Sequence, residues 1–464
     1  MTDLKKNDIF EGAVSGYTSE GAGVLKKDGF PLFVNGAAKG DVLRVRVLKV
    51  LKSYGYARIE KIMTPSADRK EAECACAGAC GGCSLMHISY AAQLEFKRCR
   101  VQDALRRIGG IEIPVCAVVP SPKIFGCRNK VSVPVKKENG KIKAGFFAPY
   151  SHRIAGDLNC ILQTDIQKKL ISAVLEYMEE SGTEPYDEEK NSGAVRHIYI
   201  REGMKSGEIM VSLVSKKASL KNEELLVKKL LAVSDKIKSI IININPDKTN
   251  VILGRKNRTL YGTDSITDEL CGLKFKIHHN SFYQVNHDVC ELLYSKAAEL
   301  IAGVCGESVL DAYCGIGTIG LCAARKAKKL TGIEYVPEAV KNAEENARLN
   351  GAENARYFAG DAPEVMAELR RAGEKFDTVI LDPPRKGCDE NLLSAVSGSK
   401  NILYISCNPE TLARDMKYLK KFGFSANEAY PFDMFPNTAH VETVVLLSQL
   451  KQKPDDYINV TIEL

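Results

Sequence analysis

A cysteine stands where an apolar segment gives way to a polar, helical one. Residues 402–406, ILYIS, have the pattern of a buried strand, Cys407 follows at once, and Asn408-Pro409 opens a helical pattern. Proline suits the first position of a helix. The positive end of a helix lowers the pKa of a thiol and makes it more nucleophilic. We therefore predict that Cys407 is a nucleophile with a lowered pKa, although a free cysteine is more often a small packed side chain.

A glycine-rich turn predicts a binding site for S-adenosylmethionine. In DAYCGIGT, residues 311–318, Gly315 and the second glycine let the backbone turn tightly beside a ligand where a strand gives way to a helix. Gly315, Gly317 and Gly320 also have the GxGxxG spacing of dinucleotide sites, but the run of Asp, an aromatic residue, Gly-x-Gly and Thr favours S-adenosylmethionine, and no GK[ST] of a P-loop follows. Glu334 ends the next strand and could accept both ribose hydroxyls. Asp361 ends the third strand and could accept a hydrogen bond from the adenine amine, with a helix N-cap as an equal alternative. Asp382 ends the fourth strand.

A nucleophilic thiol beside a methyl donor has a specific chemical use. Carbon 5 of uracil is a poor nucleophile, but addition of a thiolate to carbon 6 makes an enolate that reacts at carbon 5. A base must then remove the proton of carbon 5 so that the thiol can leave. Glu442, at the start of an apolar strand pattern, is our candidate base because desolvation would raise its pKa; His440 is assigned a structural role. Arg385 occupies the position where enzymes that methylate exocyclic amines usually have an aromatic residue, which disfavours an amine target.

A group of closely spaced cysteines predicts a metal site. The spacing Cys74-x5-Cys80-x2-Cys83 supplies three ligands, with Cys76 as an alternative to Cys74. The first residues lack the apolar core of a signal peptide, and in a cytoplasmic protein such spacing favours metal binding over disulfides. Structural zinc usually has two paired ligand sets, whereas a distant fourth ligand is common for iron–sulfur clusters. We rank an iron–sulfur cluster first, a zinc site second, and loop cysteines that bind no metal third.

The segments around these motifs indicate three domains. Residues 1–62 contain five short β segments, which suit an OB-like barrel of the kind that often binds oligonucleotides. Residues 63–270 mix strands and helices and form a predicted α+β middle domain, whose helix 89–108 could pack on the catalytic domain. Residues 271–464 alternate apolar strands with helices, the pattern of an α/β, doubly wound, Rossmann-like parallel sheet.

Charge is distributed unevenly along the chain. The net charge is +7, of which residues 1–70 contribute +5 and residues 95–160 contribute +8, so the remainder carries −6. A basic front half suggests a polyanion partner. Arg128, Asn129 and Lys130 are predicted RNA contacts, with ordinary surface positions as an equal alternative. Apolar runs stay well short of a membrane helix, so we expect a cytoplasmic protein that does not contact membranes.

The motifs taken together resemble the RNA uracil-5-methyltransferase family. The resemblance is carried by DAYCGIGT, GIEYV, DPPRKG, SCNPETLARD and HVETV, and by NSFYQVN at 280–286 before the catalytic sheet. It implies that Cys407 is the nucleophile and Glu442 the base. It implies S-adenosylmethionine contacts at Gln284, Tyr313, Glu334 and Asp382. It also implies a [4Fe–4S] cluster, with Cys160 as the fourth ligand beside Cys74, Cys80 and Cys83.

The same resemblance suggests which RNA is the substrate. The N-terminal barrel resembles a TRAM domain, and a TRAM barrel together with a cysteine cluster resembles the ribosomal branch of the family more than the tRNA branch. We therefore predict that a monomer makes 5-methyluridine in 23S ribosomal RNA. The alternatives are a tRNA uracil-5-methyltransferase, an RNA cytosine-5-methyltransferase, which would use the same thiol chemistry, and a non-catalytic iron–sulfur RNA-binding protein.

Overall fold

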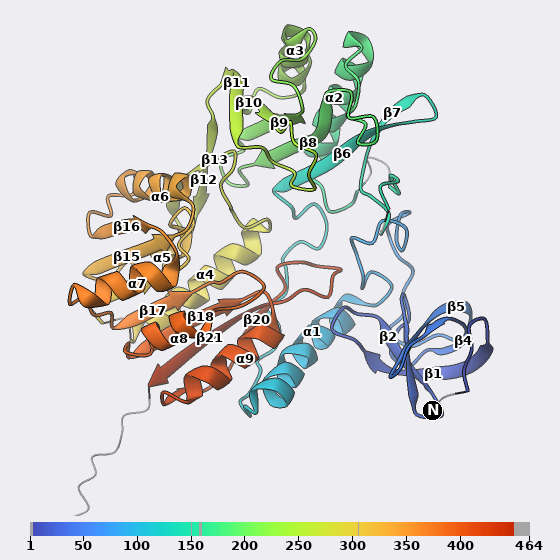
Figure 1. Ribbon diagram of the computed structural model, residues 1–464, viewed down its shortest axis with the longest axis horizontal. Coiled ribbons are helices and arrows are strands. Elements are labelled where there is room, and N and C mark those ends of the chain that lie inside the picture. Colours follow the sequence, from blue (N-terminus) through green and yellow to red (C-terminus); the bar gives the residue numbers. More distant parts are fainter. Residues whose placement is uncertain (1–2, 150, 157–159, 305, 450–464) are drawn as a thin grey trace, which may run out of the picture.

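Three large β structures organise the computed structural model, which describes residues 3–149, 151–156, 160–304 and 306–449. They are a closed barrel near the N-terminus, a six-stranded sheet and an eight-stranded sheet. Figure 1 shows the blue barrel on one side, the green sheet at the top and the orange-to-red sheet opposite the barrel. Among the described residues, no helix combines the length and the apolar character needed to cross a bilayer.

The barrel forms because its strands alternate buried apolar and exposed polar residues. Leu25, Leu32 and Val45 are among the side chains fully enclosed by it, as period-two patterning requires. The sheet closes in the order β1-β2-β3-β5-β4, which confirms the predicted OB-like barrel. Its strands are β1 (Ile9–Tyr17), β2 (Gly23–Lys27), β3 (Phe30–Val34), β4 (Val42–Val50) and β5 (Gly55–Thr64).

The second sheet carries two helices. α2 (Asp165–Ser181) begins at a capping box formed by Thr164 and Gln167, and it packs with α3 (Glu223–Val233) over one apolar face of the sheet. The strand order is β11-β10-β9-β8-β6-β7. The strands are β6 (Lys130–Glu138), β7 (Lys141–Ala144), β8 (Val195–Glu202), β9 (Ile209–Ser215), β10 (Ile237–Ile244) and β11 (Lys256–Gly262).

The eight-stranded sheet has helices on both faces. A hairpin of β12 (Ser265–Leu270) and β13 (Leu273–His278) precedes it. The strand order is β16-β15-β14-β17-β18-β21-β19, with β20 paired to β21. The strands are β14 (Ser308–Asp311), β15 (Lys329–Glu334), β16 (Ala355–Ala359), β17 (Thr378–Leu381), β18 (Asn401–Ser406), β19 (Phe424–Ala426), β20 (Tyr430–Phe432) and β21 (Glu442–Gln449).

Five strands of this sheet, β14 to β18, are parallel, and β21 runs antiparallel beside β18. Helices α4 and α5 contribute to the apolar core on one face, and α7, α8 and α9 to the core on the other, which confirms the doubly wound fold. β21 reverses because a loop, and no crossover helix, joins it to β20. The helices are α4 (His287–Ala302), α5 (Thr318–Ala323), α6 (Pro337–Leu349), α7 (Ala362–Arg371), α8 (Glu390–Val396) and α9 (Pro409–Lys420).

One further helix lies between the barrel and the eight-stranded sheet (Figure 1). α1 (Tyr90–Ala104) continues into a single wider π turn, η1 (Leu105–Gly109). Both pack against α9, and Val101, Ala104 and Leu105 join the apolar core on one face of the eight-stranded sheet. Figure 1 shows α1 in cyan with α9 on one side and the barrel on the other. The segment after the cysteine group therefore packs directly on the eight-stranded sheet.

Candidate active site and thiol cavity

Cys407 and Glu442 lie at the same end of an antiparallel strand pair. β18 and β21 pair along their length, and their last partners at this end are Ser406 and Thr443. One further step in this register sets Cys407 opposite Glu442, and residues directly opposite each other present their side chains on the same face. Sheet pairing therefore brings the predicted nucleophile and the predicted base together, although 35 positions of sequence separate them.

The turn that carries Cys407 is held by side-chain hydrogen bonds. Asn408 caps α9 by accepting from the backbone N–H of Glu410 at 3.0 Å. Asn408 itself donates from its backbone N–H to Ser406 Oγ at 3.1 Å. Its side-chain amide donates to the carbonyl of Arg385 at 3.1 Å. The Cys407 turn is thus tied to the DPPRKG loop after β17, and Arg385 lies beside the thiol.

The acidity of Cys407 differs from the prediction. Burial raises the pKa of the Cys407 thiol to about 11, and the negative charges of Glu442 and Asp382 add to this effect, while Arg385 opposes it. The predicted lowering by the helix end is therefore wrong for this free protein. A half-buried thiol between two carboxyl groups loses more from desolvation and repulsion than it gains from the helix dipole.

Glu442 has the environment that a base needs. Its side chain is buried, and this burial raises the pKa of Glu442 to about 8, with the charge of Asp382 as a second cause. Arg385 lowers the pKa of Glu442, as it does that of Cys407. Burial likewise raises the pKa of Asp382 to about 7, with Asp311 contributing repulsion. The desolvated carboxyl predicted at position 442 is present.

The glycine turn after β14 is joined to the end of β15. Gly315 and Gly317 have φ angles of 53° and 85°, which other residues adopt with strain. A Cβ on Gly317 would also lie 3.0 Å from the hydroxyl oxygen of Tyr357. Glu334 accepts from the N–H of Gly315 at 3.1 Å and from that of Val336 at 2.9 Å. The carboxylate predicted to bind ribose therefore already stands against the glycine turn.

Most other predicted cofactor residues follow the carboxyl ends of neighbouring parallel strands. Tyr313 follows β14, Asp361 follows β16 and Asp382 follows β17. Asp361 is exposed at the start of α7, and its side chain caps none of that helix's described N–H groups. Gln284 comes from elsewhere, in the loop between β13 and α4, where its carbonyl accepts from Asn129 Nδ2 at 2.8 Å. The carboxyl edge of such a sheet is where ligands bind.

The predicted RNA contacts at 128–130 are only partly available. Asn129 is buried, and it also donates from its backbone N–H to the carbonyl of Val285 at 2.9 Å. The prediction that Asn129 contacts RNA is therefore wrong, because its polar groups already fix the loop that carries Gln284. Arg128 lines a cavity of cysteines. Burial lowers the pKa of Lys130 to about 8, helped by repulsion from Arg201 and Arg128.

The grouped cysteines and the distant Cys160 surround one small cavity. It measures about 200 Å³, and its walls also include Arg128, Phe146 and Phe147. Burial raises the pKa of Cys83 to about 12, with Cys160, Cys80 and Cys74 adding repulsion and Arg128 opposing it. The cysteines that line the cavity are Cys74, Cys76, Cys80, Cys83 and Cys160. The fold therefore brings the distant cysteine to the group, as the ligand prediction requires.

The cysteines of this cavity do not form a recognisable metal-ligand group in the part of the chain that the structure describes. Across the described ranges, no three Cys, His, Asp or Glu side chains converge in the way that binding one ion requires. Iron–sulfur clusters are held by four cysteine thiolates. The walls of the cavity combine five cysteines with the rings of Phe146 and Phe147 and the cation Arg128.

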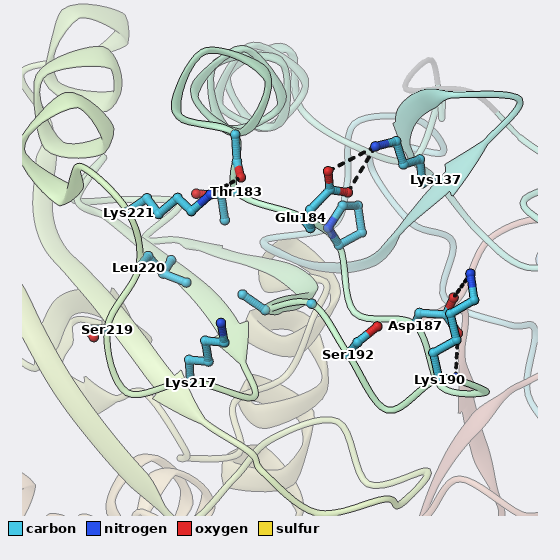
Figure 2. Close-up of a pocket in the computed structure, with 14 residues that line it drawn as sticks. Lys137, Thr183, Glu184, Asp187, Lys190, Ser192, Lys217, Ser219, Leu220 and Lys221 are labelled. Atoms are coloured by element: carbon cyan, nitrogen blue, oxygen red, sulfur yellow. Dashed lines mark hydrogen bonds and ion pairs between the residues drawn. The ribbon is translucent and has the colours of Figure 1, made fainter.

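A cavity of about 860 Å³ lies in the middle domain, away from the catalytic sheet. Figure 2 shows Lys137 paired with Glu184 and Lys190 paired with Asp187 across its lining, while Lys217 extends from the opposite wall. Lys221 donates to the carbonyl of Gly182 at 3.0 Å. The four lysines outnumber the two acids, but none of the predicted catalytic or cofactor residues lines this cavity.

Sequence reasoning missed a set of contacts behind the active site. Lys97 and Asp433 form an ion pair in which both side chains are fully buried. Arg100 forms a two-armed ion pair with Glu410, in the first turn after Cys407. The spacing of Lys97 and Arg100 on one face of α1 was visible in the sequence, but their partners lie more than 300 positions away.

Comparisons with known proteins agree with the geometry. Residues 89–450 match the family model described as tRNA (uracil-5-)-methyltransferase. An uncharacterized RNA methyltransferase of Halalkalibacterium halodurans is 42% identical, over 96% of this chain and 98% of that protein. One of Listeria monocytogenes is 43% identical, with the same two coverages.

A solved structure with the same fold extends this agreement. The tRNA (uracil-54, C5)-methyltransferase of Pyrococcus abyssi, in complex with S-adenosyl-L-homocysteine, superposes with a TM-score of 0.76 at 32% identity. The match covers 94% of this chain and all of that one. The chain therefore belongs to the RNA uracil-5-methyltransferase family, and it is an RNA methyltransferase.

Proposed function

We propose that this protein transfers the methyl group of S-adenosylmethionine to carbon 5 of a uridine in RNA, through a covalent bond between Cys407 and carbon 6. The observation that carries the proposal is that Cys407 and Glu442 directly adjoin Ser406 and Thr443, the last paired residues of two neighbouring strands, and that the Glu442 charge acts on the Cys407 thiol. The pair lies at the sheet edge where the glycine turn and Glu334 meet. A nucleophile, a base and a site for a methyl donor at one edge are the three parts that this reaction needs.

Each step assigns one role to a residue of the chain. The Cys407 thiol loses its proton to solvent, and the thiolate adds to carbon 6, which shifts the electron pair of the 5,6 double bond towards the carbonyl oxygen on carbon 4 and makes an enolate. Carbon 5 then takes the methyl group, and the carbon–sulfur bond of the donor breaks to release S-adenosylhomocysteine. Glu442 removes the proton of carbon 5, and the freed electron pair restores the double bond and expels the Cys407 thiolate.

The end of β15 suits the nucleoside part of the donor. Glu334 holds two backbone N–H groups in the free protein and presents a carboxylate that ribose hydroxyls can share. Tyr335 and Val336, immediately after it, are 74% and 46% exposed, and exposed apolar side chains beside a polar anchor suit an adenine ring. The bound S-adenosyl-L-homocysteine in the Pyrococcus abyssi enzyme supports this assignment.

RNA must deliver its base to this edge out of the stack. We propose that residues 1–62 and 63–270 hold the flanking RNA and that residues 271–464 carry the reaction. On the barrel, the rings of Phe33 and Tyr54 stack with centroids 5.0 Å apart, and Tyr56 lies edge-on to both. Aromatic surfaces on such barrels stack with unpaired bases.

The substrate we favour is 23S ribosomal RNA, because a barrel and a cysteine cavity occur together in this chain, as in the ribosomal branch of the family. One observation favours the alternative, a tRNA uridine: the Pyrococcus abyssi protein, whose structure matches 94% of this chain, is a tRNA methyltransferase. Both substrates use the same active-site chemistry, so the choice depends on RNA-binding surfaces outside the active site.

Mapping the methylated nucleotides decides between the two substrates. In a strain lacking the gene, we expect 5-methyluridine to disappear from at least one position of 23S ribosomal RNA, as measured by mass spectrometry of nuclease fragments. As the control, the wild-type gene should restore this methylation, and a gene that encodes Cys407→Ala should not. Loss from tRNA alone would establish the alternative, and loss of methylcytidine alone would contradict the uracil assignment.

We also propose that Cys74, Cys80, Cys83 and Cys160 hold a [4Fe–4S] cluster, with Cys76 as the alternative to Cys74. The shared cavity supports this proposal. When bound, the cluster would cross-link the 74–83 loop to the segment at Cys160. Arg128 lies at the cavity wall, where its charge would balance the negative charge of the ligated thiolates.

Purification without oxygen tests the cluster. We expect brown protein that contains iron and acid-labile sulfide, and we expect Cys83→Ser to lose both, because three thiolates hold a cluster poorly. The matched control is Cys99→Ser, an exposed thiol on α1 outside the cavity, which should keep the colour. A colourless wild-type protein that contains zinc would contradict the proposal.

A further inference from the structure

A row of polar side chains on α1 contacts the loop that leads into β21. Tyr90, Gln93, Lys97 and Arg100 are spaced by three, four and three positions, so they share one face of the helix. The loop, residues 433–441, joins β20 to β21 and ends immediately before Glu442. Contacts between these two segments link parts of the chain more than 330 positions apart.

The N-terminal half of this row fixes the start and middle of the loop. The Tyr90 hydroxyl donates to Asp433 Oδ2 at 2.7 Å, and Lys97 Nζ pairs with Asp433 Oδ1 and donates to the carbonyl of Phe435 at 3.0 Å. Gln93 and Asn437 bond to each other in both directions: Gln93 Nε2 donates to Asn437 Oδ1 at 3.2 Å, and the Asn437 N–H donates to Gln93 Oε1 at 2.9 Å.

Arg100 lies outside the active site and contacts both segments that carry the two reactive groups, the turn after Cys407 and the loop before Glu442. Its Nη1 donates to the carbonyl of Ala439 at 2.8 Å, three residues before Glu442. Its Nε and Nη2 donate to the two carboxylate oxygens of Glu410, three residues after Cys407, at 3.1 and 2.8 Å. The Arg100 side chain is only 11% exposed. A planar guanidinium with several donors suits such a bridge, whereas a single ammonium does not.

We propose that Arg100 is a positioning residue for methyl transfer, because it joins the helix turn that carries Cys407 to the loop that carries Glu442. The distance between these two groups must suit a uracil ring whose carbon 6 meets the thiol and whose carbon 5 faces the base. The strand register sets their pairing, but both groups lie at the end of that register. Arg100 holds the first turn of α9, which follows Cys407, and the loop that precedes Glu442. The inference rests on the proposed function.

The experiment compares two arginines of the same helix. Arg98 makes an equivalent two-armed ion pair with Glu95, at 2.8 and 2.7 Å, on the outer side of α1. We expect Arg100→Met to slow single-turnover methylation by about 10- to 100-fold, the scale on which small misplacements act. Arg98→Met should keep the wild-type rate, and Arg100→Lys should restore part of the loss because it can reach one partner.

Three readouts separate positioning from a general loss of structure. Affinity for S-adenosylhomocysteine, measured by calorimetry, should change by less than about twofold in Arg100→Met, since the donor site lies at other strand ends. Trapping of 5-fluorouridine RNA should slow in parallel with methylation. An equal rate loss in Arg98→Met, or a parallel loss of S-adenosylhomocysteine affinity in Arg100→Met, would overturn the inference.

The outcomes also separate this inference from the proposed function. If wild-type protein traps no 5-fluorouridine RNA, the covalent mechanism itself fails. If wild type traps it and Arg100→Met does so at the wild-type rate, only the positioning role fails. Should Arg100→Met not fold, Arg100→Lys decides, and an unchanged rate in that variant overturns the inference.

Discussion

Replacing Cys407 with alanine abolishes methylation of RNA, with a fall of roughly 10⁴-fold or more, the scale seen when enzymes lose a nucleophile. Without the sulfur, carbon 6 of uracil has no partner, so carbon 5 stays too weak a nucleophile to take the methyl group. Methyl transfer from radiolabelled S-adenosylmethionine measures the loss. A 5-fluorouridine RNA measures the adduct directly, because fluorine at carbon 5 prevents the final elimination and leaves the RNA bound to the wild-type protein.

Two controls show that such a loss is chemical. Affinity for S-adenosylhomocysteine should remain within about twofold of wild type, since the donor site lies at the ends of β14 and β15. Cys99→Ala, which removes an exposed thiol that contacts Glu95, should methylate at the wild-type rate. Covalent trapping that persists in Cys407→Ala would show that another residue is the nucleophile.

The candidate site follows from the sequence wherever strand ends define it. Cys407, Glu334 and Asp382 each come at the end of an apolar run, and parallel strands deliver their carboxyl ends to one edge. Glu442 begins an apolar run instead, and it reaches the same edge because β21 is antiparallel to β18. The order of apolar and polar segments was therefore enough to group these residues.

The acidity of Cys407 could not be predicted in this way. Its position before α9 argues for a lowered pKa, but the charges of Glu442 and Asp382 come from two other strands. Burial at the junction of three segments is a property of the tertiary packing. The local sequence predicts the effect of the helix end on the thiol pKa, but it does not predict the effect of charged side chains that other strands place beside the thiol.

The role of α1 was equally hidden. Helical spacing predicts the helix, but Lys97 and Gln93 are fully buried, whereas such polar residues are usually exposed. Their burial is possible because Asp433 and Asn437 satisfy them. Asn129 was likewise predicted to contact RNA together with Arg128 and Lys130, but it is buried and bonded to the loop that carries Gln284. Partners hundreds of positions away decide both cases.

The environment of Cys407 and Glu442 makes the activity of the site depend on pH. The charge of Glu442 raises the pKa of the Cys407 thiol, because a negative carboxylate beside the thiol disfavours a second negative charge. Both have a pKa above its ordinary value, about 11 and about 8, and both act in the deprotonated form. The single-turnover rate of the wild type should therefore rise with pH from 6 through about 8.

Glu442→Gln should separate the two halves of the reaction. The amide cannot accept the proton of carbon 5, so release of the product should slow by about 10²- to 10⁴-fold, the contribution of a general base. Attack by Cys407 should continue, because the substitution removes one of the charges that raise the pKa of the thiol. We therefore expect methylated RNA to remain covalently bound to Glu442→Gln, visible as a shifted band on a denaturing gel with unmodified uridine RNA.

The pH dependence of stability provides a check on the same substitution. The pKa of Glu442 in the folded protein, about 8, lies above that of an unfolded glutamate. Its contribution to stability is thus fully present below about pH 4 and is lost as the pH rises through about 8. Glu442→Gln should therefore gain in melting temperature over wild type between pH 6 and pH 9, whereas Glu390→Gln, an exposed acid, should not. Rapid release of methylated RNA by Glu442→Gln would assign the base to another residue.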